Sequence, residues 1–510
     1  PQFSIAYGLL TVEENLDATL RLRLGGLSRA EREARKTEIL TLVGLNAIAD
    51  RQVKVLSGGQ KRRLALALEL ATAPDLLLCD EVTSGLDPKA ENELVTLLKT
   101  LTQQNCRTVL SVTHSLAHLD LYDSVIVLHG GHLAYHGPPQ FLTHYFQIGE
   151  PADLYPQLSL RKPEEWHRSW QKHRSIYEAK FLPAPAEAPQ ASTSTLSSPE
   201  EAPSSLGASI DEPSTPSSPR EAGPQTASAF SQFVTLFVRR WKLFFRDPSA
   251  LWLQLALIVG FPCLVVIFAL NGLPQIQNLT QTHSTDFFKL AKENAAFVAQ
   301  ASKAGSLVSG LIMFQVILLT LMASNNAARE IAGERLIFEK EKFGGLKAGA
   351  YISSKAAFLF FLILAQSIWM GLFVKLICRF PGDLLSQIGI LVLVNTAMTA
   401  ICLAISSMSR TAEQSSLTCI YLVGFQLPLS GAVLALPETL GAVTRPFIAA
   451  YWGWSGFLQT IKETRYYDVV QMISQTPLSA GDLCVWVLVA HVLLGLFVGY
   501  AGCKNSRWPD

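Results

Sequence analysis

The stretch that decides the fold is Leu56-Ser57-Gly58-Gly59-Gln60, and a run from Lys61 to Ala71 without Gly or Pro follows it. The run is rich in Leu, Ala and Arg, which favours a helix. The first turn of a helix leaves backbone N–H groups unpaired at the positive end of the dipole, so this start can bind a phosphate. The two glycines allow a ligand to approach the backbone closely. The stretch therefore predicts an anion site at a helix N-terminus.

A second stretch, Leu76-Leu77-Leu78-Cys79-Asp80-Glu81, supplies carboxylates. Its four apolar residues predict a buried strand of an α/β sheet, and open sheets bind ligands at the carboxyl ends of their strands. At that position Asp80 would hold Mg²⁺, directly or through water, and Glu81 would orient and deprotonate an attacking water. The alternative for an isolated Asp-Glu pair is a strand that ends in two solvated acids.

Two further stretches complete a set of four that resembles the ABC transporter ATPases. Leu56 to Gln60 is similar to the signature loop of that family, and Leu77 to Glu81 is similar to its Walker B strand. Ser84-Gly85-Leu86-Asp87 resembles the D-loop, and His114 in Ser111-Val112-Thr113-His114-Ser115 resembles the switch histidine. The resemblance implies a P-loop NTPase-type α/β cassette with ATP and Mg²⁺ as cofactors.

The resemblance also implies a role for each of these residues. Two cassettes would form a head-to-tail sandwich, in which Ser57 and Gly59 of one cassette face the γ-phosphate bound by the other. Glu81 would be the catalytic base, Asp80 the Mg²⁺ ligand, and His114 the contact to the γ-phosphate within its own cassette. The residues expected to bind the nucleotide are Gln2, Leu56, Ser57, Gly58, Gly59, Gln60 and Asp87.

The first residues of the chain bear on the phosphate-binding loop. Gln2 lies where the family carries its Q-loop glutamine, so the resemblance makes Gln2 a further Mg²⁺ and water contact. No Gly-x-x-x-x-Gly-Lys-Ser/Thr sequence occurs in the 510 residues, although such a loop cradles the β and γ phosphates. We therefore expect an N-terminally truncated cassette whose P-loop lies upstream of Pro1, and we expect these residues alone not to hydrolyse ATP.

The composition indicates that a large part of the chain lies in a membrane. Hydrophobic residues make up 49% of the chain and charged residues only 16%. The hydrophobic fraction is high, and the charged fraction low, for a soluble protein. The net charge of +1 and the lack of a dominant basic block give no indication of nucleic acid as a partner. The eight cysteines form no Cys-x-x-Cys pair, so neither a disulfide framework nor a metal site is expected.

The composition also divides the chain into segments. We expect the cassette over 1–150, a cassette extension over 151–182 and a linker over 183–229. The linker is rich in Pro and Ser and cannot bury enough apolar surface to offset its ordering entropy, which predicts disorder.

Residues 230–248 predict an amphipathic connecting helix on the cytoplasmic membrane surface. Aromatic residues recur at steps of three and four, and basic residues cover the other side, where they would attract anionic headgroups. The aromatic residues are Phe230, Phe233, Phe237, Trp241, Phe244 and Phe245, and the basic residues are Arg239, Arg240, Lys242 and Arg246.

The remainder, 249–510, predicts an ABC-2 type transmembrane domain with six apolar runs of spanning length. The runs cover 249–270, 306–324, 354–377, 385–407, 415–436 and 482–502. An even number places the cassette and both termini in the cytoplasm, and the basic segment from Arg329 to Lys355 agrees with that topology. We expect a multi-pass protein of the plasma (inner) membrane.

The order of a cassette followed by a membrane domain resembles the G (White) subfamily of ABC transporters and its bacterial relatives. The resemblance rests on Arg246-Asp247-Pro248 and on the charged segment Glu334 to Glu341 followed by Gly349-Ala350-Tyr351. It implies a partial α/β cassette ahead of an all-α six-helix transmembrane domain. It also implies an ATP-driven exporter of a lipid-like or amphipathic substrate, acting as a dimer with a second half-transporter in the lipid bilayer.

Two other functions remain as alternatives. A membrane-tethered protein with a catalytically silent cassette would act in interaction or regulation, but the presence of Ser57, Asp80, Glu81 and His114 argues against it. An ATPase that powers something other than transport is disfavoured by the apolar runs on the same chain.

Polar residues within the apolar runs have two interpretations, a translocation path or bonds between helices. They are Gln254, Gln315, Gln366, Asn395, Gln426 and His491. We expect bonds between helices for most of them.

Overall fold

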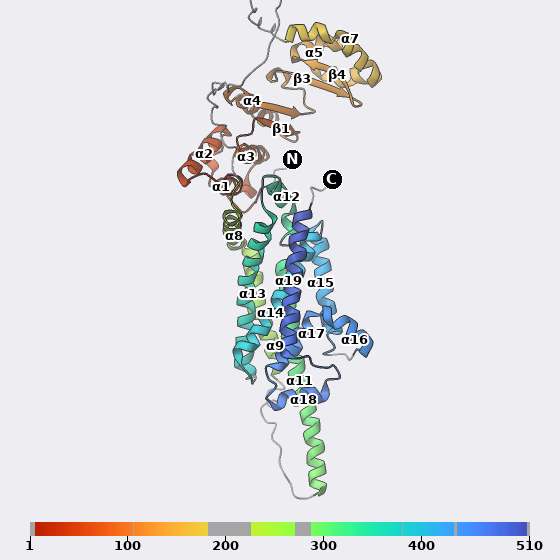
Figure 1. The fold of residues 1–510 in the computed structure, drawn as a ribbon. Helices are drawn as coiled ribbons and strands as arrows, with labels where there is room; N and C mark the ends of the chain where they lie inside the picture. The colour runs from red at the N-terminus through yellow and green to blue at the C-terminus, as the bar shows by residue number, and fades with distance from the viewer. Residues whose placement is uncertain are drawn as a thin grey trace, which may run out of the picture. The chain divides into compact units, whose positions relative to one another are not determined.

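The structure is a computed structural model that describes residues 6–105, 107–181, 226–270, 287–379, 381–432 and 436–506. Its contacts divide the chain into two compact units. The first unit comprises the described residues that fall within Thr37–Arg51 and 55–181, and the second comprises those that fall within 6–36, Gln52–Lys54 and 226–506. Figure 1 labels the elements of both units.

The first unit contains the predicted signature helix, α3 (Gly58–Leu70). Ser57 is its N-cap: the Ser57 hydroxyl accepts from the Gln60 N–H at 3.3 Å, and the Gln60 side chain accepts from the Ser57 N–H at 3.0 Å. This reciprocal pair satisfies two backbone donors at the helix start. It explains why the helix begins directly after Ser57.

A parallel pair of strands follows the signature helix. Strand β1 (Leu76–Asp80) pairs with β2 (Thr108–Val112), with Asp80 opposite Val112, and helix α4 (Pro88–Asn105) connects them. Leu77 and Cys79 are buried, whereas Leu76 and Leu78 are 55% and 67% exposed. The expectation of a fully buried strand was therefore right for one face of β1 and wrong for the other, because the described residues cover only one side of this pair.

An antiparallel hairpin completes the first unit. Strands β3 (Val125–His129) and β4 (His132–Gly137) are joined by Gly130 and Gly131, both at positive φ, which glycine adopts readily. Helix α7 (Pro163–Phe181) lies against β4. Helices α5 (Leu142–Phe146) and α6 (Leu154–Ser159) precede it. The core of this region contains Tyr135, Phe146, Trp166 and Trp170.

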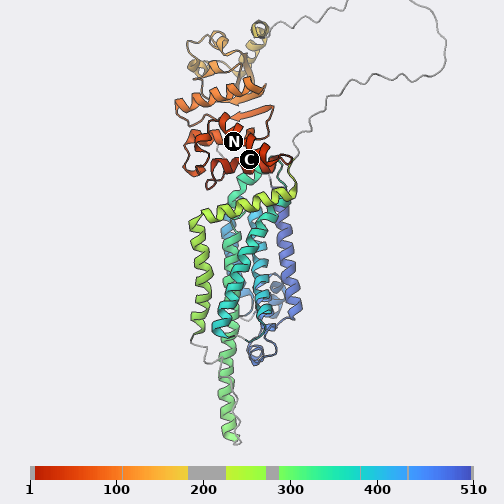
Figure 2. The same cartoon turned by 90° about the vertical axis from the view of Figure 1, so that its left-hand side faces the viewer.

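The second unit begins with helix α1 (Val12–Arg23), which Thr11 and Glu14 cap reciprocally. Helix α2 (Arg29–Leu42) follows it in the sequence. Helix α1 packs against the connecting helix α8 (Ala229–Arg246). In Figure 2, α8 is the yellow-green helix that runs crosswise over the ends of the long helices.

The long helices of the second unit are α9 (Pro248–Ala269), α11 (Phe287–Ala327), α13 (Ala348–Cys378), α14 (Leu384–Met408), α15 (Ala412–Leu429) and α19 (Gly481–Asn505). Among the described residues, five helical segments are long and apolar enough to cross a membrane. They are Pro248–Ala269, Val298–Phe343, Ala348–Cys378, Leu384–Met408 and Gly481–Asn505. The run expected over 415–436 corresponds to α15, which has only 18 residues, carries Glu413 and Gln414 in its first turn and is not among the five. A sixth span at that position stays a prediction.

Short helices fill the sequence on either side of these spans. Helix α12 (Arg335–Phe343) lies between α11 and α13, and α16 (Glu438–Thr444), α17 (Ala449–Gln459) and α18 (Arg465–Ile473) lie between α15 and α19. Helix α17 is almost entirely buried and packs against α11, α14 and α19. Its Trp454 is fully buried in the main core of the unit.

Candidate functional site

The carboxyl ends of β1 and β2 bring two of the predicted site residues together. The Glu81 N–H donates to the Val112 carbonyl at 2.9 Å, which continues the parallel pairing by one residue. The Glu81 carboxylate (Oε1) lies 2.7 Å from His114 Nε2. The His114 side chain is 78% exposed and the Glu81 side chain 21% exposed. The pair therefore lies at the surface, where a ligand can reach it.

Glu81 itself adopts an unusual backbone conformation. Its φ is +45°, in the left-handed region that a residue with a Cβ rarely occupies. The turn that follows is closed by Ser84 N–H bonded to the Glu81 carbonyl and by Gly85 at positive φ. Such strain gathers at functional sites, where the surrounding structure holds one geometry. Sequence reasoning missed this feature because no glycine marks the position.

Asp87 ends the same turn and caps α4. Its side chain accepts from the Ala90 N–H at 2.9 Å, and Asp87 is exposed. Helix α4 is also tied to the signature helix, because Arg63 forms an ion pair with Glu93. The D-loop residues and the signature helix thus belong to one connected part of the first unit.

The signature loop presents its polar groups outward. Leu56 is buried, whereas Ser57 and Gly58 are exposed. A Cβ on Gly58 or Gly59 would meet its nearest neighbour at 3.9 or 3.4 Å, so packing within the unit does not account for two glycines. The Ser57 hydroxyl accepts from Gln60 and keeps its own proton for donation. Together with α3, this loop can donate to an anion.

The carboxylates fit a magnesium ion that arrives with phosphate. Mg²⁺ takes one or two protein carboxylates and completes its shell with water and substrate phosphates. Asp80 is exposed beside Glu81 and offers such an oxygen. Within the described ranges there is no group of three or more His, Cys, Asp or Glu side chains that could hold a metal alone. Gln2, the other predicted ligand, lies outside the described residues.

The second unit holds a buried charged cluster that the sequence did not reveal. Arg239 is 7% exposed and donates to Glu341 at 2.9 Å and to the Tyr7 hydroxyl at 3.1 Å. Arg240 donates to Glu330 at 2.8 Å, and Lys355 bridges Glu330 at 3.0 Å. Burial raises the pKa of the Tyr7 hydroxyl well above its ordinary value, so Tyr7 remains neutral.

This cluster corrects the expectation that the basic residues of α8 face lipid headgroups. Arg239 and Arg240 are bound to carboxylates of the same unit, and Arg246 forms an ion pair with Glu14 of α1. Only Lys242 among the four keeps a half-exposed side chain, 3.3 Å from Glu14. The spacing of residues in α8 predicts its basic face but not the acidic partners, which lie far away in the sequence.

The polar residues of the membrane half bond between helices, as expected for most of them. Gln254 of α9 donates to Asn326 of α11, Asn326 donates to Gln366 of α13 at 3.2 Å, and Gln366 donates back to Gln254 at 3.0 Å. The three amides form a closed ring. Asn395 of α14 joins it by donating to Gln366 at 3.5 Å, and it also donates to the Ser367 hydroxyl of α13 at 3.1 Å. This confirms the bonding interpretation for Gln254, Gln366 and Asn395.

Gln426 of α15 also bonds between helices, because it accepts from the Ala450 N–H of α17 at 3.0 Å. His491 does not: a ring nitrogen of His491 lies 2.8 Å from the Val487 carbonyl of its own helix. The amide nitrogen of Gln315 is buried without a hydrogen-bond partner among the described residues.

Two family profiles match this chain. The profile described as ABC transporter covers residues 1–84, which include the signature loop, Asp80 and Glu81, and the profile described as ABC-2 type transporter covers residues 231–451. The chain belongs to the ABC transporters. It carries part of their ATPase cassette ahead of an ABC-2 type membrane domain, and this ABC transporter chain is an integral membrane protein.

Relatives of this ABC transporter chain fall into two groups, those that match its whole length and those that match about a third of it or less. The ABC transporter ATP-binding/permease protein Rv1747 of Mycobacterium tuberculosis is 26% identical over 100% of the chain and 53% of its own length. The methionine import ATP-binding protein MetN 2 of Acinetobacter baylyi is 35% identical over 35% of the chain and 53% of its own length. The broad substrate specificity ATP-binding cassette transporter ABCG2 of Bos taurus is 35% identical over 30% of the chain and 26% of its own length. The chain spans about half of these relatives' length or less.

A solved structure also matches the cassette segment. The ATP-binding cassette MJ0796, in a dimeric post-hydrolysis state bound to ADP and Pi, is 32% identical. The match covers 26% of this chain and 58% of that one, with a TM-score of 0.24.

Proposed function

We propose that the complete protein is an ATP-driven membrane transporter in which this chain supplies the hydrolytic acids of the cassette and the membrane domain. The observation that carries the proposal is the Glu81 carboxylate 2.7 Å from His114 at the ends of β1 and β2, in a chain that continues into an ABC-2 type domain. The same observation argues against a silent cassette, because the pair keeps the spacing of a hydrogen bond.

Each residue then has a chemical task. Glu81 orients the attacking water and accepts its proton, and His114, held by Glu81, donates to the γ-phosphate. Asp80 would hold Mg²⁺, which neutralises the charge on the phosphates when it is bound. Ser57 and the N–H groups of α3 donate to the nucleotide held by a second cassette. Gln2 and Asp87 would contribute further contacts at the edge of that sandwich.

The two-cassette arrangement makes the functional unit a dimer of half-transporters. The chain carries one signature loop and one Glu81–His114 pair, and in the proposed sandwich each loop serves the nucleotide of the other copy. Nucleotide binding would favour the closed dimer and hydrolysis the open one, so the membrane domain would alternate between two states of different substrate affinity. The cassette and both termini would lie in the cytoplasm.

The chain itself supplies a route between the cassette residues and the membrane domain. Residues Gln52–Lys54 belong to the second unit, where the Val53 N–H donates to the Leu10 carbonyl at 3.0 Å, and the signature loop begins two residues later. Within the second unit, Glu14 of α1 binds Arg246 of α8. A displacement of the signature loop would therefore pull on residues that are fixed to the connecting helix.

We propose an amphipathic or lipid-like substrate and an outward direction of transport. Support comes from the similarity of the cassette segment to that of a broad-specificity transporter and from the order of cassette and ABC-2 domain. The import proteins match only the cassette, so they do not bear on the membrane half.

Uptake into inside-out vesicles tests both parts of the proposal. Vesicles with the complete protein should accumulate a fluorescent amphiphile when ATP is added outside, and Glu81→Gln should abolish the accumulation. Glu164→Gln, at an exposed carboxylate of α7, is the matched control and should transport normally. ATP-dependent accumulation that survives Glu81→Gln would remove Glu81 from its role, and accumulation only in right-side-out vesicles would reverse the direction.

A further inference from the structure

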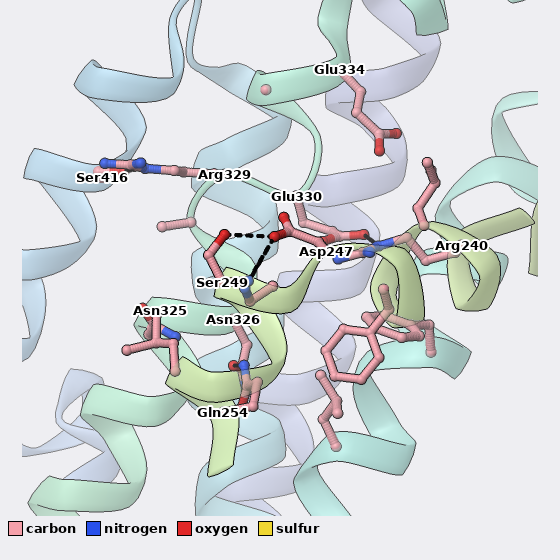
Figure 3. A pocket seen from close by; sticks show the side chains of 18 of the residues that line it. Arg240, Asp247, Ser249, Gln254, Asn325, Asn326, Arg329, Glu330, Glu334 and Ser416 are labelled. Atoms are coloured by element: carbon pink, nitrogen blue, oxygen red, sulfur yellow. Dashed lines mark hydrogen bonds and ion pairs between the residues drawn. The ribbon is translucent and has the colours of Figure 1, made fainter. Parts of the chain in front are cut away.

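The second unit contains an open cavity of about 960 Å³ near the junction of α8 and α9. Its walls come from α8, α9, α11, α12, α13 and α15, together with the segment before α1 and the segment that follows α11. Figure 3 shows the polar side chains that line it. A volume of this order accommodates a ligand of substantial size.

The cavity has one polar end and one apolar side. Leu253, Leu257 and Phe261 line it at steps of four residues along α9, a distance of about 12 Å at 1.5 Å per residue. Leu321 of α11 and Ile420 of α15 face the same space. Leu253, Leu321 and Ile420 are 48%, 38% and 55% exposed, so the apolar side is open to the surroundings of a membrane span.

The carboxylates at the polar end are already bound to protein donors. Asp247 caps α9 and accepts from the Ser249 N–H at 3.1 Å (Figure 3). It also accepts from the Ala250 N–H at 3.2 Å. Glu330 accepts from Arg240 and Lys355, and Glu334 accepts from Lys355 at 2.6 Å. These acids are therefore compensated by neighbouring groups.

Arg329 is the cation at this end with donors to spare. It is exposed, and its Nε donates to the Ser416 hydroxyl at 2.7 Å, which is its one polar side-chain contact among the described residues. Both lie on the same side of the cavity in Figure 3. A guanidinium offers five N–H donors in a planar fork that matches a phosphate. Asn325, also exposed, lies in the last turn of α11, and Arg329 follows in the turn after that helix. Asn325 lines the cavity as well and adds an amide donor.

We propose that this cavity binds one membrane glycerophospholipid, with its phosphate against Arg329 and Asn325 and an acyl chain along Leu253, Leu257 and Phe261. The phosphate accepts hydrogen bonds from the guanidinium and the amide, and the acyl chain covers an apolar wall that the described residues leave open. The lipid remains associated with the unit whether or not nucleotide is bound, so the site stands apart from the proposed transport activity.

Photo-cross-linking to the purified complete protein tests the site. The probe is phosphatidylglycerol with a diazirine in one acyl chain, and labelled peptides are mapped by mass spectrometry without added ATP. Labelling is expected on the α9 peptide that contains Leu257, and Arg329→Gln should lower it about tenfold, since a charge-assisted pair is lost. Arg410→Gln removes an exposed cation that does not line the cavity and should leave labelling unchanged.

Two further arms separate recognition of phosphate from apolar adsorption. Leu257→Trp fills the cavity and should reduce labelling, whereas Leu255→Trp, on an exposed side of α9 outside the cavity, should not. A diazirine diacylglycerol, which lacks phosphate, should label weakly, and inorganic phosphate should not displace the phospholipid. Equal labelling of the Arg329→Gln and Arg410→Gln variants, strong labelling by diacylglycerol, or displacement by inorganic phosphate would overturn the proposal. ATP turnover is not read in these arms, so their failure leaves the proposed transport function untouched.

Discussion

Each of the two units contains a pair formed by an acidic and a basic side chain, but the two pairs differ in how far they are exposed to solvent. In the first unit, Glu81 and His114 meet at the surface, with side chains 21% and 78% exposed. In the second unit, Glu330 and Lys355 meet in the interior, and each side chain is 5% exposed. A buried ion must find its partners within the protein, whereas an exposed pair keeps capacity for a ligand. The exposed pair is thus the one proposed to meet nucleotide, whereas the buried cluster contributes to the packing of the second unit.

Breaking the buried cluster should have the largest effect on stability. Lys355→Met removes the cation that bridges Glu330 and Glu334 and leaves Glu330 with Arg240 alone. Loss of one partner from a buried ion pair costs about 3–5 kcal/mol. The midpoint of thermal unfolding in detergent should fall by many degrees, while Lys347→Met, at an exposed lysine of the same segment, should change it little. Equal midpoints for both variants would show that the cluster does not stabilise the fold.

Breaking the exposed pair should affect catalysis and leave stability nearly unchanged. His114→Ala removes the group that Glu81 holds at 2.7 Å. Loss of one donor to the transition state costs about 10²–10³-fold in turnover, which we expect for ATP hydrolysis by the complete protein. His129→Ala, at the end of β3, is the control with normal turnover. If His114→Ala lowers the unfolding midpoint as much as Lys355→Met does, the contrast between the two clusters fails.

The amide ring of the membrane half offers an intermediate case, because it is buried but uncharged. Gln366→Leu leaves Gln254 and Asn326 each short of one hydrogen bond. Bonds between spans are worth about 0.6 kcal/mol on average, so we expect a loss of about 1 kcal/mol. Unfolding in detergent should detect it against Ser353→Leu, at an exposed position of α13. A loss as large as that of Lys355→Met would place the ring among the main stabilising contacts.

The partly solvated pair of Glu14 and Arg246 should have the smallest effect, and that effect depends on pH. Burial alone would raise the pKa of Glu14, but hydrogen bonds from Arg246 and the Thr11 backbone and the charge of Lys242 lower it from 4.5 to about 2. The lowered pKa means that its stabilisation is complete above pH 4.5 and is lost as the pH falls toward 2. Solvent screening limits it to about 1 kcal/mol or less.

The difference in unfolding midpoint between wild type and Glu14→Gln therefore measures the contribution of this pair as a function of pH. The unfolding midpoints of the two proteins should differ most at pH 6, and the difference should shrink as the pH is lowered from 4.5 toward 2. Glu438→Gln, at an exposed carboxylate, should match the wild type throughout. A difference that grows on acidification would reverse the sign of the linkage.

The elements that could be predicted from the sequence are those with local signals. Ser57 and Gln60 define the start of α3 through a capping box, Gly130 and Gly131 mark the hairpin, and the acids after Cys79 mark the end of β1. The amphipathic period of α8 was also correct. Each of these features depends on residues within a few positions of one another.

The features that the sequence did not predict depend on distant partners or on backbone strain. Arg239 binds Glu341, and Arg240 binds Glu330, although about a hundred residues of chain separate the partners. Periodicity predicts which face of a helix is basic but not which residues pack against that face. The left-handed backbone of Glu81 carries no glycine as a signal. The cavity with Arg329 forms only where six helices, α8, α9, α11, α12, α13 and α15, meet.

The central claim is that Glu81, held at the surface beside His114, is the base for ATP hydrolysis. The most direct measurement is magnesium-dependent phosphate release by the purified complete protein, wild type against Glu81→Gln at equal nucleotide binding. The account predicts turnover in the wild type and a loss of at least about 10²-fold in the variant, with ATP still bound. A wild-type protein without magnesium-dependent turnover, or a variant that hydrolyses ATP at the wild-type rate, would contradict it.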